Sequence, residues 1–525
     1  MTLKKFSFSK KQTVDLFFVL FFGLLVCLFV RRTFQNDTYY LIKIGEYILD
    51  NGLDFKDHYA WAADLGYTYP HFLYNIFLAF VYRSFGFDGV YASVLVFGFL
   101  LAVSIYFVLN KVAEYTTSKL SMRFFVGFAT AVIVACTFGT FVCARSQTIT
   151  YVLWLFEALL LMRMLDAGRS RYMIGVVFIS WLVAMMHATA WYFTFILFIP
   201  FIVACYISKE EIKIASNGLS YSELGCSDKI VFMDEHQVSN LKYLWISLIA
   251  AFAVGLFTPS RICYSATFKI MSSGVQDYIV EFQPMVVANT PYFLIAVGLF
   301  VVVFALFKSK CRLDLLLLYC GVMIMSFLSV RHGMLFVLFG SMAFVYSVGS
   351  VLNDVNISVD IPVLAKRFLF GTICVVFIIA GLFRMDKTFG DYEDPLYAPT
   401  DVVKYIKGLD NYESLRIFNP YNIGSYLLFN DIPVFIDSRA NIYTKAFSPE
   451  LEYSLVDDLV ALNHFSSEWY DVEARYDFDY FIISNTSDLC NVFKLMDDKE
   501  LVFSGEKFNV YASLPANAIP SGVHE

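Results

Sequence analysis

Charged residues are scarce in this sequence. Of its 525 residues, 16% are charged and 58% are hydrophobic, and the mean hydropathy is +0.62. A soluble globular domain has about 25% charged and about 45–50% apolar residues, so this composition excludes an ordinary soluble domain and indicates a surface that faces lipid. The net charge of −7 also lacks the basic excess that a nucleic-acid partner requires. We therefore expect no nucleic acid among its partners.

The 10 cysteines provide no disulfide framework and no zinc motif. Most of them lie inside apolar runs, where cysteine behaves as a small hydrophobic residue. No CxxC pair or Cys/His cluster is present, although a single long-range bridge that includes Cys263 stays open. A dinucleotide fingerprint, a P-loop and a nucleophile elbow are also absent from the sequence, which argues against nucleotide-driven and serine-hydrolase chemistry.

Long apolar runs dominate what is present. Aromatic residues reach 18%, which suits lipid-facing helices and interfacial belts. A transmembrane helix requires roughly 20 mostly apolar residues. Runs of about that length lie at 13–30, 88–109, 122–143, 147–165, 172–187, 189–207, 242–258, 291–308, 313–329, 332–350 and 367–384. The first run has no small-residue cleavage site after it, so we expect a span and not a removable signal. The sequence therefore predicts an α-helical polytopic membrane protein with about eleven transmembrane helices.

The positions of lysine and arginine predict the orientation of these helices. Positive residues are enriched in cytoplasmic loops, and four lysines precede the first run: Lys4, Lys5, Lys10 and Lys11. The even-numbered loops carry further positive residues, which include Lys111, Arg163, Lys209, Lys308 and Lys366. We therefore expect a multi-pass protein of the cell membrane with a cytoplasmic N-terminus. Arg31 and Arg32 disagree, because they lie at the outer end of the first run.

The C-terminal part, residues 385–525, differs in kind because it is polar and acidic. Alternating patterns predict strands at 415–420, 433–438, 478–484 and 508–514, and two stretches predict helices at 399–409 and 448–463. We expect an extracytoplasmic α/β domain here and a transmembrane domain over residues 1–384.

The segment 31–87 is a large external loop between the first two runs. Its stretch 36–52 is amphipathic and ends at Gly52, a residue type that commonly stops a helix. Its stretch 69–86 is apolar on one side but short for a span. Both stretches fit helices that lie along the membrane surface.

Ionisable side chains gather on the predicted outer face: Asp37, Asp54, Asp57, Arg145, His187, Arg261, Asp277, Glu281, Arg331 and His332. Such groups at a membrane boundary are costly and often functional. Arg145 and Arg331 suit a phosphate or pyrophosphate, because a guanidinium offers a fork of donors that stays charged. Asp37 or Asp57 suits a general base for a hydroxyl proton, or a ligand of a divalent metal ion. No other cofactor is indicated.

Each of these residues also has a structural alternative. Asp37 is of a type that caps helices, and Asp54 and Asp57 fit solvated turns. Arg145 and Arg331 fit helix ends that are anchored at lipid headgroups. His187 fits a histidine whose hydrogen bonds are satisfied within a tight turn. Only the joint placement of these residues on one predicted face favours a functional cavity.

The layout resembles the GT-C superfamily of membrane glycosyltransferases, which use polyprenyl-phosphate sugars. In that superfamily the first span precedes an external loop with an early acidic residue and two juxtamembrane helices, and Asp37 in FQNDTYYLIKIGEYI takes that acidic place. The chain is more closely similar to a group of bacterial and archaeal GT-C-like membrane proteins. The matching pieces are ARSQTITYVLW (144–154), MMHATAWY (185–192), VEFQP (280–284), SVRHGMLF (329–336) and IFNPYNIGSYLLFNDIPVFIDSRANIY (417–443).

The last of these pieces is the most specific, since the group tends to show Gly-Gly-Tyr-Leu followed by Phe-Ile-Asp-Gly-Arg there. Ser438 stands in place of the glycine in this chain, Ser146 stands in place of a proline, and Ala188 stands in place of a glycine after His187.

The resemblance implies a set of roles for the polar residues. Asp37 would be the base or a metal carboxylate. Arg145 and Arg331 would face the lipid phosphate, assisted by His332 and His187. Further side chains would reach toward the same cavity: Glu281, Asp437 and Arg439. A salt-bridged strand end is the structural alternative for the last two.

The leading hypothesis is therefore a membrane glycosyltransferase. It would move a sugar from a polyprenyl-phosphate donor to an envelope glycan, lipid or protein acceptor at the outer face. Three alternatives stay open: an envelope polysaccharide polymerase or ligase, a lipid or solute transporter, and a non-catalytic envelope assembly protein. A transporter should show paired repeats or broken helices with charges near the bilayer midplane, and the sequence shows no such repeat.

Overall fold

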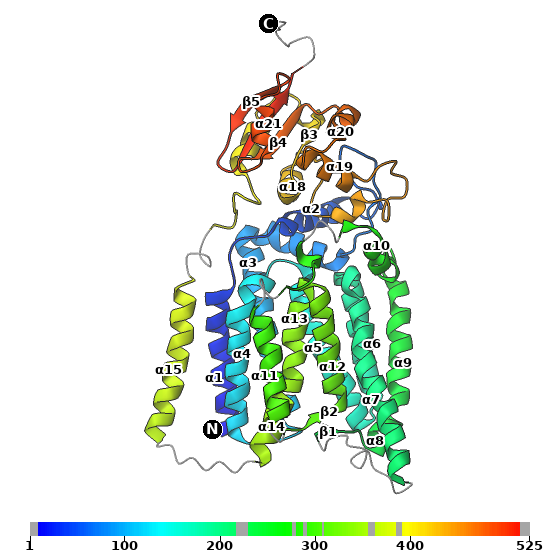
Figure 1. Ribbon diagram of the computed structural model, residues 1–525, viewed down its shortest axis with the longest axis vertical. Coiled ribbons are helices and arrows are strands. Elements are labelled where there is room, and N and C mark those ends of the chain that lie inside the picture. The colour runs from blue at the N-terminus through cyan, green and yellow to red at the C-terminus, as the bar shows by residue number, and fades with distance from the viewer. Residues whose placement is uncertain are drawn as a thin grey trace, which may run out of the picture. The chain divides into compact units, whose positions relative to one another are not determined.

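The computed structural model describes residues 9–216, 229–275, 280–286, 291–306, 309–354, 363–384 and 391–514. The chain divides into two compact units, whose helices and strands Figure 1 labels. Unit 1 consists of Met1–Arg31, Ala92–Tyr264 and Ile279–Gly390, and unit 2 of Arg32–Tyr91, Ser265–Tyr278 and Asp391–Glu525. Asp277, one of the residues of the predicted outer face, lies outside the described residues.

Unit 1 is built from apolar helices. Its long helices are α1 (Lys10–Phe29), the second part of α3 (Phe72–Ala113), α4 (Leu120–Phe141), α5 (Ser146–Ala167), α6 (Arg171–Met186), α7 (Tyr192–Ser216), α9 (Leu241–Ala253), α11 (Pro291–Leu306), α12 (Leu313–Leu328), α14 (Ser341–Asp354) and α15 (Val363–Leu382). Among the described residues, 7 helical segments are long and apolar enough to cross a membrane, and four shorter helices are also apolar. Each predicted run falls on one of these helices, and the protein is a multi-pass membrane protein.

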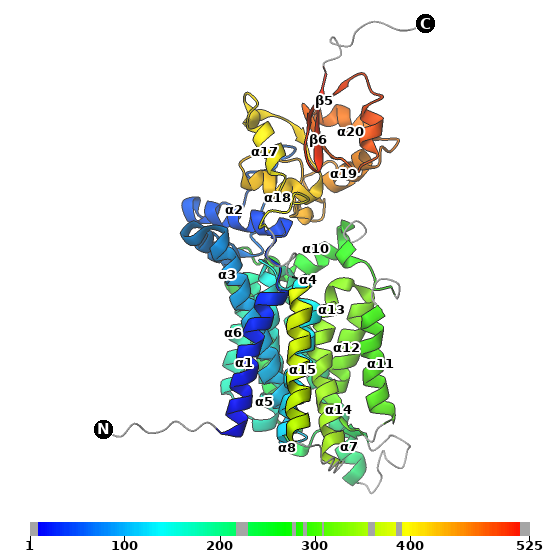
Figure 2. The same cartoon turned by 90° about the vertical axis from the view of Figure 1, so that its left-hand side faces the viewer.

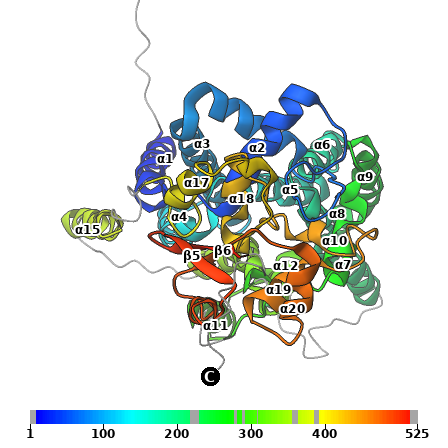
Figure 3. The same cartoon turned by 90° about the horizontal axis from the view of Figure 1, so that it is seen from above.

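Aromatic side chains pack the first helices of unit 1 against one another. The helix α1 begins with a capping box, in which Ser9 accepts from the backbone of Gln12 and Gln12 accepts from the backbone of Ser9. Along its length, Phe17 packs on Phe370 of α15 at 4.9 Å between ring centroids, and the two helices run side by side (Figure 2). Seen from above in Figure 3, α5, α6 and α9 also lie next to one another. The abundance of phenylalanine in the sequence thus supplies the contacts between helices.

One helical stretch of unit 1 changes its pitch close to predicted site residues. The 3₁₀ turn η6 (Val330–His332) leads into α13 (Gly333–Leu335), the π-helical segment η7 (Phe336–Gly340) and then α14. Short π segments within helices often occur at functional sites. This one begins at Phe336, the last residue of the SVRHGMLF piece.

Unit 2 begins with the two helices predicted in the first external loop. The helix α2 (Asn36–Asn51) ends at Gly52, which has φ +83°, so the expected stop signal is confirmed. The stretch 69–86 forms the start of α3, which breaks at Gly86 with φ +61° and then continues toward Ala113. Only glycine adopts such a conformation without strain. That these helices lie along a membrane surface stays a prediction.

The C-terminal residues of unit 2 contain a four-stranded sheet. Its strands are β3 (Ile417–Phe418), β4 (Tyr480–Ser484), β5 (Lys499–Ser504) and β6 (Phe508–Ser513), in the order β3-β4-β6-β5. The strand β3 is parallel to β4, and the other pairs are antiparallel. The helices are α17 (Thr400–Ile406), α18 (Tyr421–Phe429), α19 (Leu455–Asn463), α20 (Trp469–Tyr476) and α21 (Leu489–Phe493). Three predicted strands and both predicted helices are present in shorter form, while β5 was not predicted.

The prediction of a strand over 433–438 is wrong. Only Val434 forms an isolated bridge there, with Ala60 of the first external loop. Beyond it, the side chain of Asn419 takes the place of a neighbouring strand. Its amide oxygen accepts from the backbone of Phe435 at 2.9 Å, and its amide nitrogen donates to the carbonyl of Ile436 at 2.8 Å. A side chain thus satisfies backbone groups that an alternating sequence pattern assigns to a sheet.

Unit 2 contains more than the predicted C-terminal domain, because the first external loop packs with the C-terminal residues. The helix α2 packs on α18, and the carbonyl of Tyr59 accepts from the backbone of Val434 at 3.0 Å. Arg32 belongs to the same unit. Its guanidinium lies 4.1 Å from the ring centroid of Tyr392 and pairs with Asp88 at 3.6 Å. These partners give Arg32 a structural role, which explains its place at the outer end of the first run although positive residues are enriched in cytoplasmic loops.

Candidate functional site

Two arginines of unit 1 gather around one short segment. Arg145 has extended backbone directly before α5, and its guanidinium pairs with Glu281 at 3.5 Å. Arg331, in η6, lies with its guanidinium 5.2 Å from the ring centroid of Phe282. The two cations therefore contact consecutive residues of the turn η5 (Val280–Phe282). We call Arg145, Glu281, Phe282 and Arg331 the arginine cluster.

Backbone hydrogen bonds hold this turn beside the end of α12. The backbone of Val330 donates to the carbonyl of Gln283 at 3.0 Å, and the hydroxyl of Ser329 donates to the carbonyl of Glu281 at 2.9 Å. The VEFQP and SVRHGMLF pieces, about fifty residues apart in the sequence, thus form one local structure. The side chains of Arg145 and Glu281 stay 22% and 51% exposed, so this charge pair is accessible to a ligand.

Two hydrogen bonds orient the ring of His332, and the roles of its nitrogens follow for the neutral ring. Its Nδ1 lies 3.0 Å from the carbonyl of Met325, and because a carbonyl only accepts, Nδ1 carries the proton. Its Nε2 then accepts from the hydroxyl of Tyr192 at 3.3 Å. Both ring nitrogens therefore have protein partners. This geometry favours a role in positioning Tyr192 over direct contact of His332 with a phosphate.

His187 is buried at the end of α6, with its Nδ1 3.4 Å from the hydroxyl of Thr150. This burial favours the structural alternative for His187, because a buried imidazole with a hydroxyl partner is not open to a lipid headgroup. The hydroxyl of Thr150 also donates to the carbonyl of Ser146 at 2.8 Å. His187 and the start of α5 are thereby linked.

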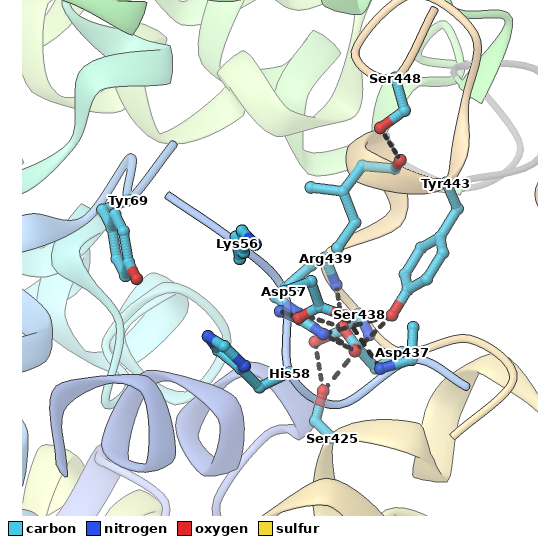
Figure 4. Close-up of polar contacts among 12 residues, drawn as sticks. Lys56, Asp57, His58, Tyr69, Ser425, Asp437, Ser438, Arg439, Tyr443 and Ser448 are labelled. Carbon is cyan, nitrogen blue, oxygen red and sulfur yellow. Dashed lines mark hydrogen bonds and ion pairs between the residues drawn. The ribbon is translucent and has the colours of Figure 1, made fainter. Parts of the chain in front are cut away.

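Three further predicted residues meet in unit 2, as Figure 4 shows: Asp57, Asp437 and Arg439. The Nε of Arg439 lies 2.9 Å from one carboxylate oxygen of Asp437, and its Nη2 lies 2.6 Å from the other. Its Nη1 donates to Asp57. The hydroxyl of Tyr443 donates to Asp437 at 2.6 Å. We call these four residues the buried network.

Every charge of the buried network is shielded from solvent. The side chains of Arg439, Asp57 and Asp437 are 2%, 1% and 0% exposed. Burial alone would lower the pKa of Arg439, but Asp437 and Asp57 outweigh it and raise that pKa well above its usual value. The guanidinium therefore stays charged and is fully occupied by carboxylates.

This geometry corrects two of the expected roles. Asp57 accepts from Arg439 and, at 2.9 Å, from the backbone of Ala60, so it is not available as a general base. Asp437 and Arg439 contact each other and do not face an open cavity, as the structural alternative expects. The pairing of Arg439 with Asp437 is local, but its pairing with Asp57 spans 382 residues and has no local signal.

The buried network also explains features of the IFNPYNIGSYLLFNDIPVFIDSRANIY piece. Gly424 of α18 lies so close to the backbone of Ile436 and Asp437 that a Cβ would overlap them. The hydroxyls of Ser425 and Ser438 lie 2.7 Å apart. The two serines are therefore one hydrogen-bonded pair between α18 and the segment that carries Asp437.

Asp37 lies in the first turn of α2 and is half-buried. The N-cap of this helix is Gln35, so the expectation that Asp37 caps it is wrong. A carboxylate in the first turn is nevertheless favourable, because the helix N-terminus carries a partial positive charge. The role of Asp37 as the reacting carboxylate stays a prediction.

A metal centre has no support in the donor set. Among the described residues, no group of three or more His, Cys, Asp or Glu side chains is arranged to hold a metal ion. A Mg²⁺ ion can also be held by one or two carboxylates together with water and substrate phosphates. A divalent metal ion at Asp37 therefore stays a prediction.

The chain was compared with known proteins in three ways. No protein-family model matches the chain, and no curated protein matches it. Among solved structures, the chain is similar to a cryo-EM structure of the arabinofuranosyltransferase AftD from Mycobacteria, with 12% sequence identity and a TM-score of 0.48. The match covers 98% of this chain and 42% of that one, so this chain spans less than half of the length of AftD.

Proposed function

We propose that the protein is a membrane glycosyltransferase that uses a polyprenyl-phosphate sugar as donor. The acceptor is a glycan, lipid or protein of the cell envelope, and the reaction takes place at the outer face of the cell membrane. The observation that carries the proposal is the arginine cluster, in which two guanidiniums contact consecutive residues of one turn. Paired, partly exposed guanidiniums are the protein groups best suited to a phosphate.

In the proposed reaction, an acceptor hydroxyl oxygen attacks the anomeric carbon of the donor. The bond from that carbon to the phosphate oxygen breaks, and its electron pair leaves with the lipid phosphate. Arg145 and Arg331 stabilise the charge that grows on this leaving phosphate. The hydroxyl proton passes to a carboxylate, and the resemblance to GT-C enzymes assigns that role to Asp37. The same resemblance implies inversion at the anomeric carbon.

The first experiment measures donor binding by native mass spectrometry of the full chain in detergent. The probe is a synthetic polyprenyl-phosphate sugar. We expect the wild type to retain this lipid and the double variant Arg145→Ala, Arg331→Ala to lose it. The matched control is Arg169→Ala with Arg171→Ala, which removes two exposed arginines of unit 1 outside the cluster. Equal retention by both double variants would rule out a phosphate site at the arginine cluster.

The second experiment concerns Asp37. In a transfer assay with the same donor, Asp37→Asn should abolish transfer, because an amide does not accept the hydroxyl proton. Donor binding and the thermal unfolding temperature should stay at the wild-type level. Full transfer by Asp37→Asn would show that Asp37 is not the reacting carboxylate. It would not affect the proposal of a donor site at the arginine cluster.

A further inference from the structure

A second polar cluster in unit 2 centres on Asp54. Its carboxylate accepts from the hydroxyl of Tyr47 at 2.6 Å, from Nε2 of His58 at 2.6 Å and from the hydroxyl of Tyr69 at 2.9 Å. The backbone of Lys56 adds a bond at 3.2 Å. We call Tyr47, Asp54, His58 and Tyr69 the Asp54 cluster. None of the four residues belongs to the buried network or the arginine cluster.

These bonds fix which nitrogen of the His58 ring faces Asp54. Burial raises the pKa of Asp54, but the hydrogen bonds from Tyr47, Lys56, His58 and Tyr69 outweigh it and hold that pKa well below its usual value. Since an ionised carboxylate only accepts, Nε2 of His58 carries the proton. In the neutral ring the lone pair is then on Nδ1. Among the described residues, no hydrogen bond to this Nδ1 is found.

Aromatic rings surround the same atoms. The rings of Tyr47 and His58 stack with centroids 4.5 Å apart, and Phe55 packs edge-on against Tyr69 at 5.8 Å. The side chains of Asp54 and His58 are 35% and 37% exposed, so the cluster is open to solvent. Figure 4 shows His58 and Lys56 near Asp57. The accessible part of the cluster thus consists of His58 and Asp54 beside the ring of Tyr47, while Tyr69 is buried.

The loop that carries the cluster adopts strained backbone at two positions. Phe55 has φ +60° and Tyr69 has φ +48°, a region that side-chain-bearing residues rarely adopt. Such conformations cost about 1–3 kcal/mol each and tend to occur at functional sites. Both strained residues flank Asp54 in space. The hydrogen bonds of Asp54 with the Lys56 backbone and with Tyr69 hold this strained backbone in place, at a cost to stability.

We propose that the Asp54 cluster is a subsite that binds a neutral, hydroxyl-rich ligand, the carbohydrate acceptor of the transferase. The proposal rests on the proposed function, which supplies the need for such an acceptor. Nδ1 of His58 accepts a hydrogen bond from one sugar hydroxyl, and the hydroxyl oxygen of Tyr47, which is partly exposed, has a lone pair for another. Ring faces cover the apolar face of a sugar. A phosphate or carboxylate ligand fits poorly, because the cluster already holds the negative charge of Asp54.

The test measures binding of methyl glycosides of glucose, mannose, galactose and arabinose to the full chain in detergent, by saturation-transfer NMR. Two substitutions separate the ring nitrogens of His58. His58→Asn places an amide oxygen near the position of Nδ1, while His58→Gln places its amide near Nε2. The control is His464→Gln, an exposed histidine of the same unit. Thermal unfolding temperatures confirm that each variant is folded.

We expect at least one glycoside to bind the wild type and His464→Gln equally, and about tenfold more weakly to His58→Gln, the effect of losing one hydrogen bond. His58→Asn should restore most of the binding. In a transfer assay, His58→Gln should raise the KM of the acceptor and leave the KM of the donor unchanged. Absence of glycoside binding by the wild type, or equal binding by His58→Gln and His464→Gln, would overturn the subsite. If the wild type does not bind the polyprenyl-phosphate donor, the proposed function is overturned instead. The two failures are therefore distinguishable.

Discussion

The arginine cluster of unit 1 and the buried network of unit 2 both pair arginine with a carboxylate. The pair is partly exposed in the arginine cluster and buried in the buried network. In the buried network, Arg439 is 2% exposed and makes close contacts with two carboxylates. In the arginine cluster, Arg145 is 22% exposed, and its carboxylate partner lies 3.5 Å away and is itself 51% exposed. Complete pairing in the absence of water leaves a charge with only a structural role, whereas loose pairing at a surface leaves it open to a ligand.

The largest effect is expected where pairing is complete. Arg439→Met leaves two buried carboxylates without a partner and should lower the free energy of unfolding of unit 2 by about 3–5 kcal/mol. Thermal unfolding of the full chain and protease cleavage within residues 391–514 report this loss. Arg416→Met is the matched control, because its pair with Asp477 is 52% and 88% exposed and should contribute at most about 1 kcal/mol. Similar stability of the two variants would remove the distinction between the two clusters.

A smaller effect is expected from the packing behind the buried network. Gly424→Ala forces a Cβ against the backbone of Ile436 and Asp437 and should destabilise the protein by about 1–3 kcal/mol. Gly321→Ala, in α12, is the opposite case, because no heavy atom lies within 4 Å of its added Cβ. Alanine is there favoured by helix propensity. Unfolding temperatures that move in the same direction for both variants would contradict the close approach at Gly424.

The smallest effect on stability is expected in the arginine cluster. The double variant Arg145→Ala, Arg331→Ala should change the free energy of unfolding by less than about 1 kcal/mol, because the ion pair is partly exposed. Donor binding should be lost in the same sample. If this variant loses as much free energy of unfolding as Arg439→Met, Arg145 and Arg331 stabilise the fold as strongly as the buried network does. That result would contradict the distinction between the two clusters.

The parts of the fold that follow from local pattern were predictable. Long apolar runs predict the helices of unit 1, and Gly52 marks the end of α2 because only glycine takes its conformation freely. The strand over 433–438 failed for a physical reason. Its backbone groups bond to the side chain of Asn419, which no periodicity of hydrophobic residues reveals.

The candidate site was predictable only in part. Residue type and predicted side of the membrane brought out Arg145, Arg331 and Glu281, and these do meet in unit 1. The same reasoning treated Asp57 as a base, because its partner lies far away in the sequence. Asp54, set aside as a turn residue, accepts four hydrogen bonds from side chains and backbone that only the folded loop brings together.

The separation of Asp57 and Arg439 has a consequence for biosynthesis. The two residues are 382 positions apart, and a ribosome adds about 5–20 residues per second. Roughly 20 to 80 s thus pass between the emergence of the aspartate and that of its arginine. During this interval the carboxylate has no guanidinium to neutralise it, so the first external segment cannot reach its final burial. Folding of that segment must therefore wait until Arg439 has been translated, and chains truncated before Arg439 should leave the segment open to proteases.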